Sequence, residues 1–249
     1  MRPVITLLTD FGTADGYVGE IKGVLFARVA GASVVDVTHD IPPQDVEAGR
    51  LTLARVWRRF PPGTVHLAIV DPGVGGDRRA LAVESDERAL VGPDNGVLSP
   101  ALLVAGARAV ALPIPPSASA TFHGRDVFAP AAAELALGRP LEALGTPVHD
   151  PVIRRTPEPH RLPNGGIQGQ VISVDRFGNL VTNLVGIRSG VVEVSGMTLP
   201  LRRTYADVAR GSLVALIGSS GLIEIALRDG SAADKLQLTR GNAVVFRST

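Results

Sequence analysis

Apolar residues follow two different spacings along the first part of the chain. Short runs rich in β-branched and aliphatic residues are typical of strands buried on both faces; they are Pro3–Thr9, Ser33–Thr38, Thr64–Val70 and Ala80–Glu84. Apolar residues recur every three or four positions in Tyr17–Ala30 and Gln44–Phe60, which predicts helices, and Pro100–Ala107 and Val127–Leu137 are candidates for two more. This alternation predicts an α/β fold, a mostly parallel sheet with flanking helices in a Rossmann-like arrangement.

The pattern changes after His149. Residues 149–166 contain four prolines, mixed charge and no periodicity, which indicates a linker. Beyond it, short apolar runs separated by Gly, Asn, Asp and Ser predict a small antiparallel β-barrel or sandwich without a helix; the runs are Gln168–Val174, Leu180–Leu184, Gly190–Val194, Leu213–Ile217, Leu222–Leu227, Lys235–Leu238 and Ala243–Phe246. We therefore expect an α/β domain over residues 1–155 and a smaller β-barrel domain over residues 166–249.

Composition and charge restrict the partners. The 25 Lys plus Arg against 24 Asp plus Glu give a net charge of +1, which argues against nucleic-acid binding driven by counterion release. The absence of Cys excludes disulfides, Cys-ligated zinc and thiol catalysis. No run of about 20 apolar residues predicts a membrane span. The first apolar run is broken by Asp10 and makes a poor signal peptide, so we expect a cytoplasmic protein.

Polar residues follow the predicted strands at the edge where open α/β sheets bind ligands. The clusters are Thr9–Gly12, Asp36–Asp40, Asp71–Arg79, Gly92–Gly96 and Phe122–Asp126. Each has a purely structural alternative, because Asp10 and Asp36 can cap helices, residues 94–96 suit a turn, and His123 can be an ordinary surface residue. Their common placement on one sheet is a stronger indication than any single member.

The glycine-rich segment 71–79 invites comparison with phosphate-binding loops. It matches neither GxxxxGK[ST] nor GxGxxG, since Arg78 stands where the third Gly belongs. A metal-dependent phosphoesterase acting on a nucleotide is an alternative, because Asp and His are suitable metal ligands; the candidates are Asp10, Asp36, His39, Asp71, Asp94 and His123. Their spacing matches no metal-binding motif, so this stays a second hypothesis.

Several segments, taken in order along the chain, resemble one family. They are Thr-Asp-Phe-Gly at 9–12, Asp-Pro-Gly-Val-Gly at 71–75 with Arg78, Pro-Asp-Asn-Gly at 93–96, Phe-His-Gly-Arg-Asp at 122–126, Asp-Arg-Phe-Gly-Asn at 175–179, Thr-Asn at 182–183 and Ser-Ser-Gly at 219–221. The ordered set is similar to the S-adenosyl-L-methionine (SAM) hydroxide adenosyltransferases, whose relatives include the fluorinase and chlorinase.

The resemblance implies hydrolysis of SAM to adenosine and methionine by attack of water on the ribose C5′ carbon, without a cofactor or metal. The family's water-activating residues correspond to Asp71, Arg78 and His123. The halogenating relatives have Tyr in place of the Asp and Ser after the His position. Asp71 and Gly124 stand there in this chain, so the water-using branch is the better match.

The resemblance also implies how substrate is held. Asp10 corresponds to the residue that binds the ribose hydroxyls, Asp175 to the partner of the methionine ammonium and Ser219 to a contact of its carboxylate. Phe177 and Asn179 correspond to adenine contacts, although FGN could equally be a simple turn. Family members are trimers with each site between the N-terminal domain of one subunit and the C-terminal domain of the next. A non-catalytic adenosine-binding protein is a third hypothesis.

Overall fold

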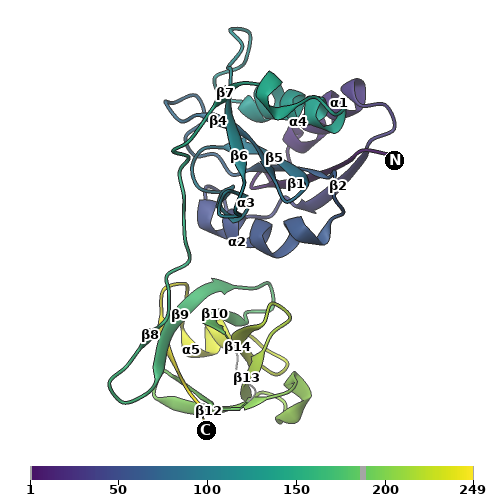
Figure 1. Ribbon diagram of the computed structural model, residues 1–249. Coiled ribbons are helices and arrows are strands. Elements are labelled where there is room, and N and C mark those ends of the chain that lie inside the picture. Colours follow the sequence, from purple (N-terminus) through teal and green to yellow (C-terminus); the bar gives the residue numbers. More distant parts are fainter. Residues whose placement is uncertain (1, 186–188, 249) are drawn as a thin grey trace. The chain divides into compact units, whose positions relative to one another are not determined.

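The computed structural model describes residues 2–185 and 189–248. The chain divides into two compact units, Met1–Arg155 and Thr156–Thr249 (Figure 1). None of the helices among the described residues is long and apolar enough to cross a membrane.

The first unit is built on a sheet with the strand order β2-β1-β3-β5-β4-β6-β7. Its strands are β1 (Val4–Thr9), β2 (Ser33–Thr38), β3 (Val65–Ile69), β4 (Ala80–Ser85), β5 (Arg88–Pro93), β6 (Arg108–Leu112) and β7 (Thr146–Pro147). The β2-β1-β3-β5 part is parallel, as the sequence predicts. The rest is antiparallel, because β4 and β5 form a tight hairpin and β6 and β7 continue from it. The sheet is therefore mixed.

Helices cover both faces of this sheet (Figure 1). One face carries α1 (Tyr17–Arg28) and α4 (Ala129–Ala136), and the other carries α2 (Val46–Val56) and α3 (Ser99–Leu102). Each layer has its own apolar core, so the strands between them are buried on both sides. The predicted helices over 17–30 and 44–60 are confirmed, whereas the one expected over 100–107 is a single turn. Short helical turns are η1 (Trp57–Arg59), η2 (Gly124–Phe128) and η3 (Leu141–Ala143).

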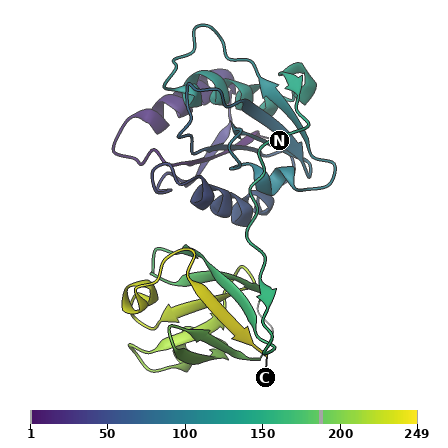
Figure 2. The same ribbon diagram turned by 90° about the vertical axis from the view of Figure 1, so that its left-hand side faces the viewer.

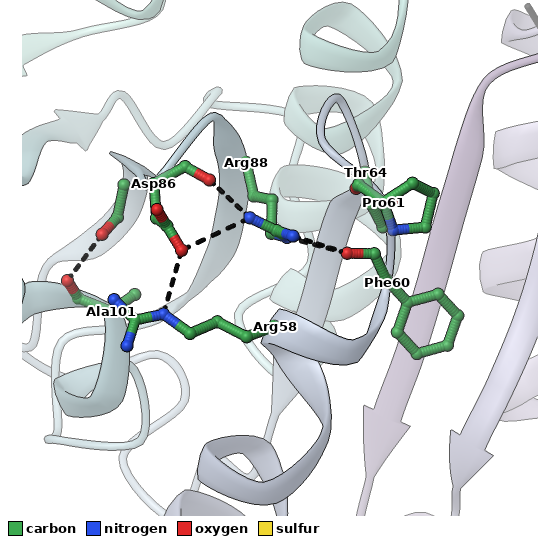
Figure 3. Close-up of polar contacts among 8 residues, drawn as sticks. Arg58, Phe60, Pro61, Thr64, Asp86, Arg88 and Ala101 are labelled. Atoms are coloured by element: carbon green, nitrogen blue, oxygen red, sulfur yellow. Dashed lines mark hydrogen bonds and ion pairs between the residues drawn. The ribbon is translucent and has the colours of Figure 1, made fainter.

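An arginine clamp holds the hairpin turn between β4 and β5 (Figure 3). Asp86 and Glu87 both have left-handed backbones, with φ of 50° and 59°, which suits a tight hairpin but is costly for residues other than glycine. Arg88 donates from Nε and Nη2 to the carbonyl oxygen of Phe60, at 2.9 and 2.7 Å, and from Nη1 to the Asp86 carbonyl at 2.6 Å. Arg58 Nε binds Oδ2 of Asp86 at 2.9 Å. These bonds stabilise the strained turn.

The second unit is a closed β-barrel (Figure 2). Its strand order is β10-β14-β13-β12-β11-β15-β9, and β9 pairs with β10 to close it, while β8 adds to β9. The strands are β8 (His160–Arg161), β9 (Ile167–Val174), β10 (Leu180–Val185), β11 (Val191–Val194), β12 (Met197–Arg202), β13 (Leu213–Ile217), β14 (Leu222–Leu227) and β15 (Ala243–Arg247). The pairs are antiparallel except β12–β13, which is parallel. The predicted barrel is confirmed, with this one parallel pair.

One prediction for the second unit is wrong. The sequence predicted a strand over Lys235–Leu238 and no helix, but α5 (Ala232–Leu236) occupies this region. The Ser231 side chain caps it by accepting a hydrogen bond from Asp234 N at 3.1 Å, and Gln237 ends it with a left-handed backbone. A second short turn, η4 (Tyr205–Asp207), follows β12.

Candidate active site

Arg78 joins the other two side chains predicted to activate water. Asp71 lies just beyond β3, Arg78 lies before β4, and His123 lies before η2. Arg78 Nε donates to Oδ1 of Asp71 at 2.9 Å, and Nη2 makes a second bond to Oδ2 of the same carboxylate. Nη2 also lies 3.0 Å from Nδ1 of His123. Residues from two segments that are 45 positions apart in the sequence therefore form one hydrogen-bonded group.

The group is shielded from water. The side chains of Asp71 and Arg78 are 6% and 9% exposed, and His123 is 5% exposed. The guanidinium of Arg78 also lies over the ring of Phe128, 5.2 Å from its centroid. Arg78 Nη1 is buried without a hydrogen-bond partner among the described residues. An unpaired buried donor is costly, so a donor in this position is suited to an oxygen that the substrate complex brings.

One close backbone approach and one irregular helical turn bring this group together. Gly75 has a left-handed backbone with φ of 77°, and a Cβ there would collide with the carbonyl oxygen of Ala120. Only glycine lets the Asp71–Arg78 loop lie against the loop that precedes His123. After His123 the chain forms the single π-helical turn η2, an irregularity that is frequent at functional sites. Asp126 in this turn accepts a hydrogen bond from Ser119 N at 2.9 Å, which ties down the preceding loop.

His123 is held in its neutral form. Burial and the positive charge of Arg78 lower its pKa from the ordinary 6.5, while Asp71 and Asp126 oppose the shift. Because Arg78 donates to Nδ1, that nitrogen is an acceptor, and the proton of the neutral ring is on Nε2. His123 therefore presents an N–H donor at Nε2.

The Pro-Asp-Asn-Gly segment at 93–96 is hydrogen-bonded to both ends of the Asp71–Arg78 loop. Arg79 Nε donates to Oδ2 of Asp94 at 2.7 Å, and Asn95 Nδ2 donates to the carbonyl oxygen of Val70 at 2.8 Å. Asp94 Oδ1 accepts a third bond, from Val152 N at 2.7 Å. The described residues hold no group of three or more His, Cys, Asp or Glu placed to bind a metal. Asp94 has a structural role here, which its turn-like sequence partly indicated.

Asp10 lies at the end of β1, next to the strand that leads to Asp71. Its Oδ2 accepts a hydrogen bond from Gln44 N at 2.7 Å. Gln44 has a left-handed backbone with φ of 67°, which is uncommon outside glycine. A cavity of about 350 Å³ adjoins the Asp71–His123 group and is lined by aromatic side chains, among them Phe11, Tyr17 and Phe122.

The barrel carries the other predicted residues. Asp175 organises the turn between β9 and β10, because Oδ1 accepts from Phe177 N and Asn179 N and Oδ2 from Asn179 Nδ2, each at 2.9 Å. Phe177 is 75% exposed, whereas Asn179 is 6% exposed. Both line a cavity of about 700 Å³ in the barrel unit. The turn interpretation of FGN is thus correct, and it also presents the Phe177 ring to this cavity.

Sequence reasoning missed other residues of this cavity. Tyr205 and Arg228 line it, and the Tyr205 hydroxyl donates to Oε1 of the buried Glu224 at 2.7 Å. Burial, together with Glu224, raises the pKa of Tyr205 to about 12. No motif marks these positions, since Thr204–Asp207 reads as an ordinary polar turn. Ser219 is exposed at the turn between β13 and β14 and is not among the residues that line this cavity.

Comparisons with known proteins agree with this arrangement. Residues 5–145 match the model of the SAM hydroxide adenosyltransferase N-terminal domain, and residues 169–245 match that of its C-terminal domain. The chain is 44% identical to an (R)-S-adenosyl-L-methionine hydrolase of Thermus thermophilus, over 98% of this chain and 99% of that protein. It is 40% identical to one from Salinispora tropica, over 96% of each chain. A fluorinase of Actinopolyspora mzabensis is 30% identical over 98% of this chain and 96% of that protein.

Solved structures agree as well. A conserved protein of Thermotoga maritima superposes with a TM-score of 0.88 at 32% identity, covering 97% of this chain and 99% of that chain. A conserved protein of Thermus thermophilus gives a TM-score of 0.84 at 43% identity, covering 99% and 100%. With both domains matched in order and the Asp71–Arg78–His123 group assembled, this chain belongs to the SAM hydroxide adenosyltransferase family.

Proposed function

We propose that this protein hydrolyses SAM to adenosine and L-methionine, with Asp71, Arg78 and His123 directing one water molecule at the ribose C5′ carbon. The observation that carries the mechanism is Arg78, which binds Asp71 and His123 while its Nη1 remains a buried donor without a partner among the described residues. This donor supplies a fixed dipole where an attacking oxygen would gain negative charge.

The leaving group sets what the site must supply. A sulfonium departs as a neutral thioether, so the reaction needs neither an oxyanion hole nor an acid for the leaving group. Water is a poor nucleophile because its pKa is near 15.7, so it must be oriented in line with the C5′–S bond and relieved of a proton. The new C5′–O bond forms as the C5′–S electron pair leaves with sulfur, which becomes the thioether of methionine.

The hydrogen bonds indicate how the proton is handled. Arg78 cannot accept a proton. His123 has its Nδ1 lone pair directed at Arg78 and carries hydrogen on Nε2, so it donates. Asp71 is the remaining group with free acceptor capacity, so it takes the proton, while Arg78 and His123 stabilise the developing hydroxide. General-base assistance of this kind is worth about 10²–10⁴ in rate.

The remaining roles follow from the resemblance. Asp10 binds the ribose hydroxyls, Asp175 the methionine ammonium and Ser219 its carboxylate. Phe177 stacks on adenine and Asn179 binds its edge, which fits the exposed ring of Phe177 and its place in the barrel cavity. No cofactor takes part in this scheme.

We also propose a homotrimer in which the α/β unit of one subunit meets the barrel unit of the next at each site. The division of the proposed site residues between two compact units supports this proposal. A cytoplasmic location remains a prediction that cell fractionation tests.

Incubation with SAM in EDTA, with chloride present, tests the activity. We expect equimolar adenosine and methionine from the wild type and loss of both products in Arg78→Ala. Arg55→Ala is the control, because Arg55 lies exposed near the end of α2, and it should retain full activity. Inhibition by EDTA would instead support the metal-dependent phosphoesterase. Binding of adenosine without formation of products would support an adenosine-binding protein. Formation of 5′-chloro-5′-deoxyadenosine would support a halogenase.

A further inference from the structure

His39 is a buried histidine that the proposed chemistry does not use. It follows β2, its side chain is 5% exposed, and Nδ1 lies 2.8 Å from Oγ1 of Thr9, the last residue of β1. Nε2 lies 3.1 Å from Oδ1 of Asp36, an electrostatic contact rather than a well-formed hydrogen bond. Lys22 Nζ in turn donates to Oδ2 of Asp36 at 2.6 Å.

These contacts fix the direction of each hydrogen bond. Partial burial disfavours ionisation of Asp36, but Lys22 and His39 outweigh it and lower the pKa of this carboxyl. An ionised carboxylate beside Nε2 favours a proton on that nitrogen, which leaves Nδ1 to accept the Thr9 hydroxyl proton. Thr9 Oγ1 is then free to accept from Phe11 N, which lies 3.3 Å away.

The backbone of His39 holds the same turn from its other end. Its carbonyl oxygen accepts from Gly12 N at 2.8 Å, and Gly12 has the left-handed backbone, φ 65°, that this turn requires. His39 therefore binds the turn Thr9–Gly12 at both ends. Asp10 lies between those ends, with its Oδ2 also fixed by Gln44 N.

We propose that His39 is a positioning residue for the nucleoside: it sets the Thr9–Gly12 turn so that the Asp10 carboxylate faces the ribose 2′ and 3′ hydroxyls. This inference rests on the proposed function, through the ribose role of Asp10. Two adjacent hydroxyls require a carboxylate held in one orientation, and displacement of about 1 Å in such a site costs up to 10²-fold. His39 does not touch the substrate.

Two substitutions of His39 by amide residues test its Nδ1 and Nε2 contacts separately. The amide of Asn lies near the position of Nδ1, so His39→Asn keeps a partner for Thr9. The amide of Gln lies near that of Nε2, so His39→Gln keeps the Asp36 side only. By calorimetry, we expect His39→Asn to bind adenosine within about twofold of wild type, and His39→Gln to bind about 10-fold more weakly, the cost of a lost buried hydrogen bond.

A ligand that lacks the two ribose hydroxyls separates an effect on ribose binding from a general effect on the structure. Affinity for 2′,3′-dideoxyadenosine should be the same in wild type and His39→Gln, and His39→Gln should add nothing to Asp10→Ala. If His39→Gln does not fold, Thr9→Val removes the same hydroxyl bond and should give the same pattern.

Three results would overturn the inference. Equal weakening of adenosine and dideoxyadenosine would show a general structural effect. Additive losses from Asp10→Ala and His39→Gln would show independent roles. Unchanged adenosine affinity in Asp10→Ala would show that Asp10 does not bind the ribose. SAM hydrolysis by the wild type is measured separately and shows whether the proposed activity is present.

Discussion

At the scale of residues, the central feature is one guanidinium that binds two different groups. Arg78 holds both oxygens of Asp71 and reaches Nδ1 of His123, all below a tenth of full exposure. A lysine ammonium is a single point and cannot reproduce this fork. The arrangement brings together the Asp71 carboxylate, a neutral imidazole and Nη1 of Arg78, which has no hydrogen-bond partner among the described residues. This combination fits the activation of water that we propose.

This arrangement predicts the titration of His123. Burial and Arg78 lower its pKa, so the neutral ring should persist to pH values below 6.5, and turnover should be retained there. We expect a midpoint below 6.5 by NMR in the wild type, moving upward in Arg78→Gln as the positive charge is removed. A wild-type midpoint at or above 6.5, or one that Arg78→Gln leaves in place, would contradict the assigned hydrogen bonds.

At the scale of elements, the site depends on loops that lie unusually close. Gly75→Ala should separate the Asp71–Arg78 loop from the loop before His123, because the new methyl group meets the Ala120 carbonyl oxygen and the left-handed backbone is strained. We expect turnover to fall about 10- to 100-fold, in line with a displacement of about 1 Å. Gly23→Ala, on the exposed side of α1 with open space around it, is the control and should stabilise the protein by about 0.5–1 kcal/mol. Equal activities in the two variants would show that this approach does not matter.

A second prediction at this scale concerns stability and rests on His66, near the start of β3. His66 is 1% exposed, and burial, with help from Arg88, lowers its pKa to about 4. The unfolded chain, with an ordinary pKa near 6.5, therefore binds the proton more tightly between pH 6.5 and 4. Unfolding free energy should fall by about 3 kcal/mol as pH drops through that window, and the contribution is complete above it.

Denaturant unfolding between pH 7 and pH 4 checks this. In His66→Gln, most of this decrease in unfolding free energy with falling pH should be lost, whatever the stability of the variant at pH 7. His149 is exposed, so His149→Gln should keep the decrease. An unchanged slope in His66→Gln would show that His66 is not buried as a neutral ring.

Elements could be predicted where their periodicity is strong. The strands β1 to β4 and the helices α1 and α2 follow the pattern of apolar residues closely. Strand β5 was missed because it starts at Arg88 and ends at Gly92-Pro93, and β12 because Pro200 interrupts it. Helix α5 was missed because its few residues are held by the Ser231 cap and by barrel packing, neither of which a periodicity reveals.

At the scale of the whole molecule, the sequence placed the candidate residues but not their contacts. Asp71, Arg78 and His123 came from a resemblance, and only the fold shows that one guanidinium joins them. The Tyr205–Glu224 and Thr9–His39 hydrogen bonds join residues that are far apart in the sequence, so no local pattern signals them.

Mixing of subunits tests the proposed trimer. Arg78→Ala and Asn179→Ala, each inactive alone, should restore about a quarter of wild-type sites when co-expressed, because a site shared between neighbours can combine the two intact units. Co-expressed wild type and Arg78→Ala serves as the reference for random assembly. Absence of any restored activity, or a fully active monomer, would contradict a shared site.

The central claim, that this protein directs water at C5′, is tested most directly by hydrolysis of SAM in H₂¹⁸O. The account predicts one ¹⁸O atom in the 5′-hydroxyl of adenosine, unlabelled methionine, and loss of both products in Asp71→Asn. Adenosine without the label, or a wild-type rate retained in Asp71→Asn, would contradict it.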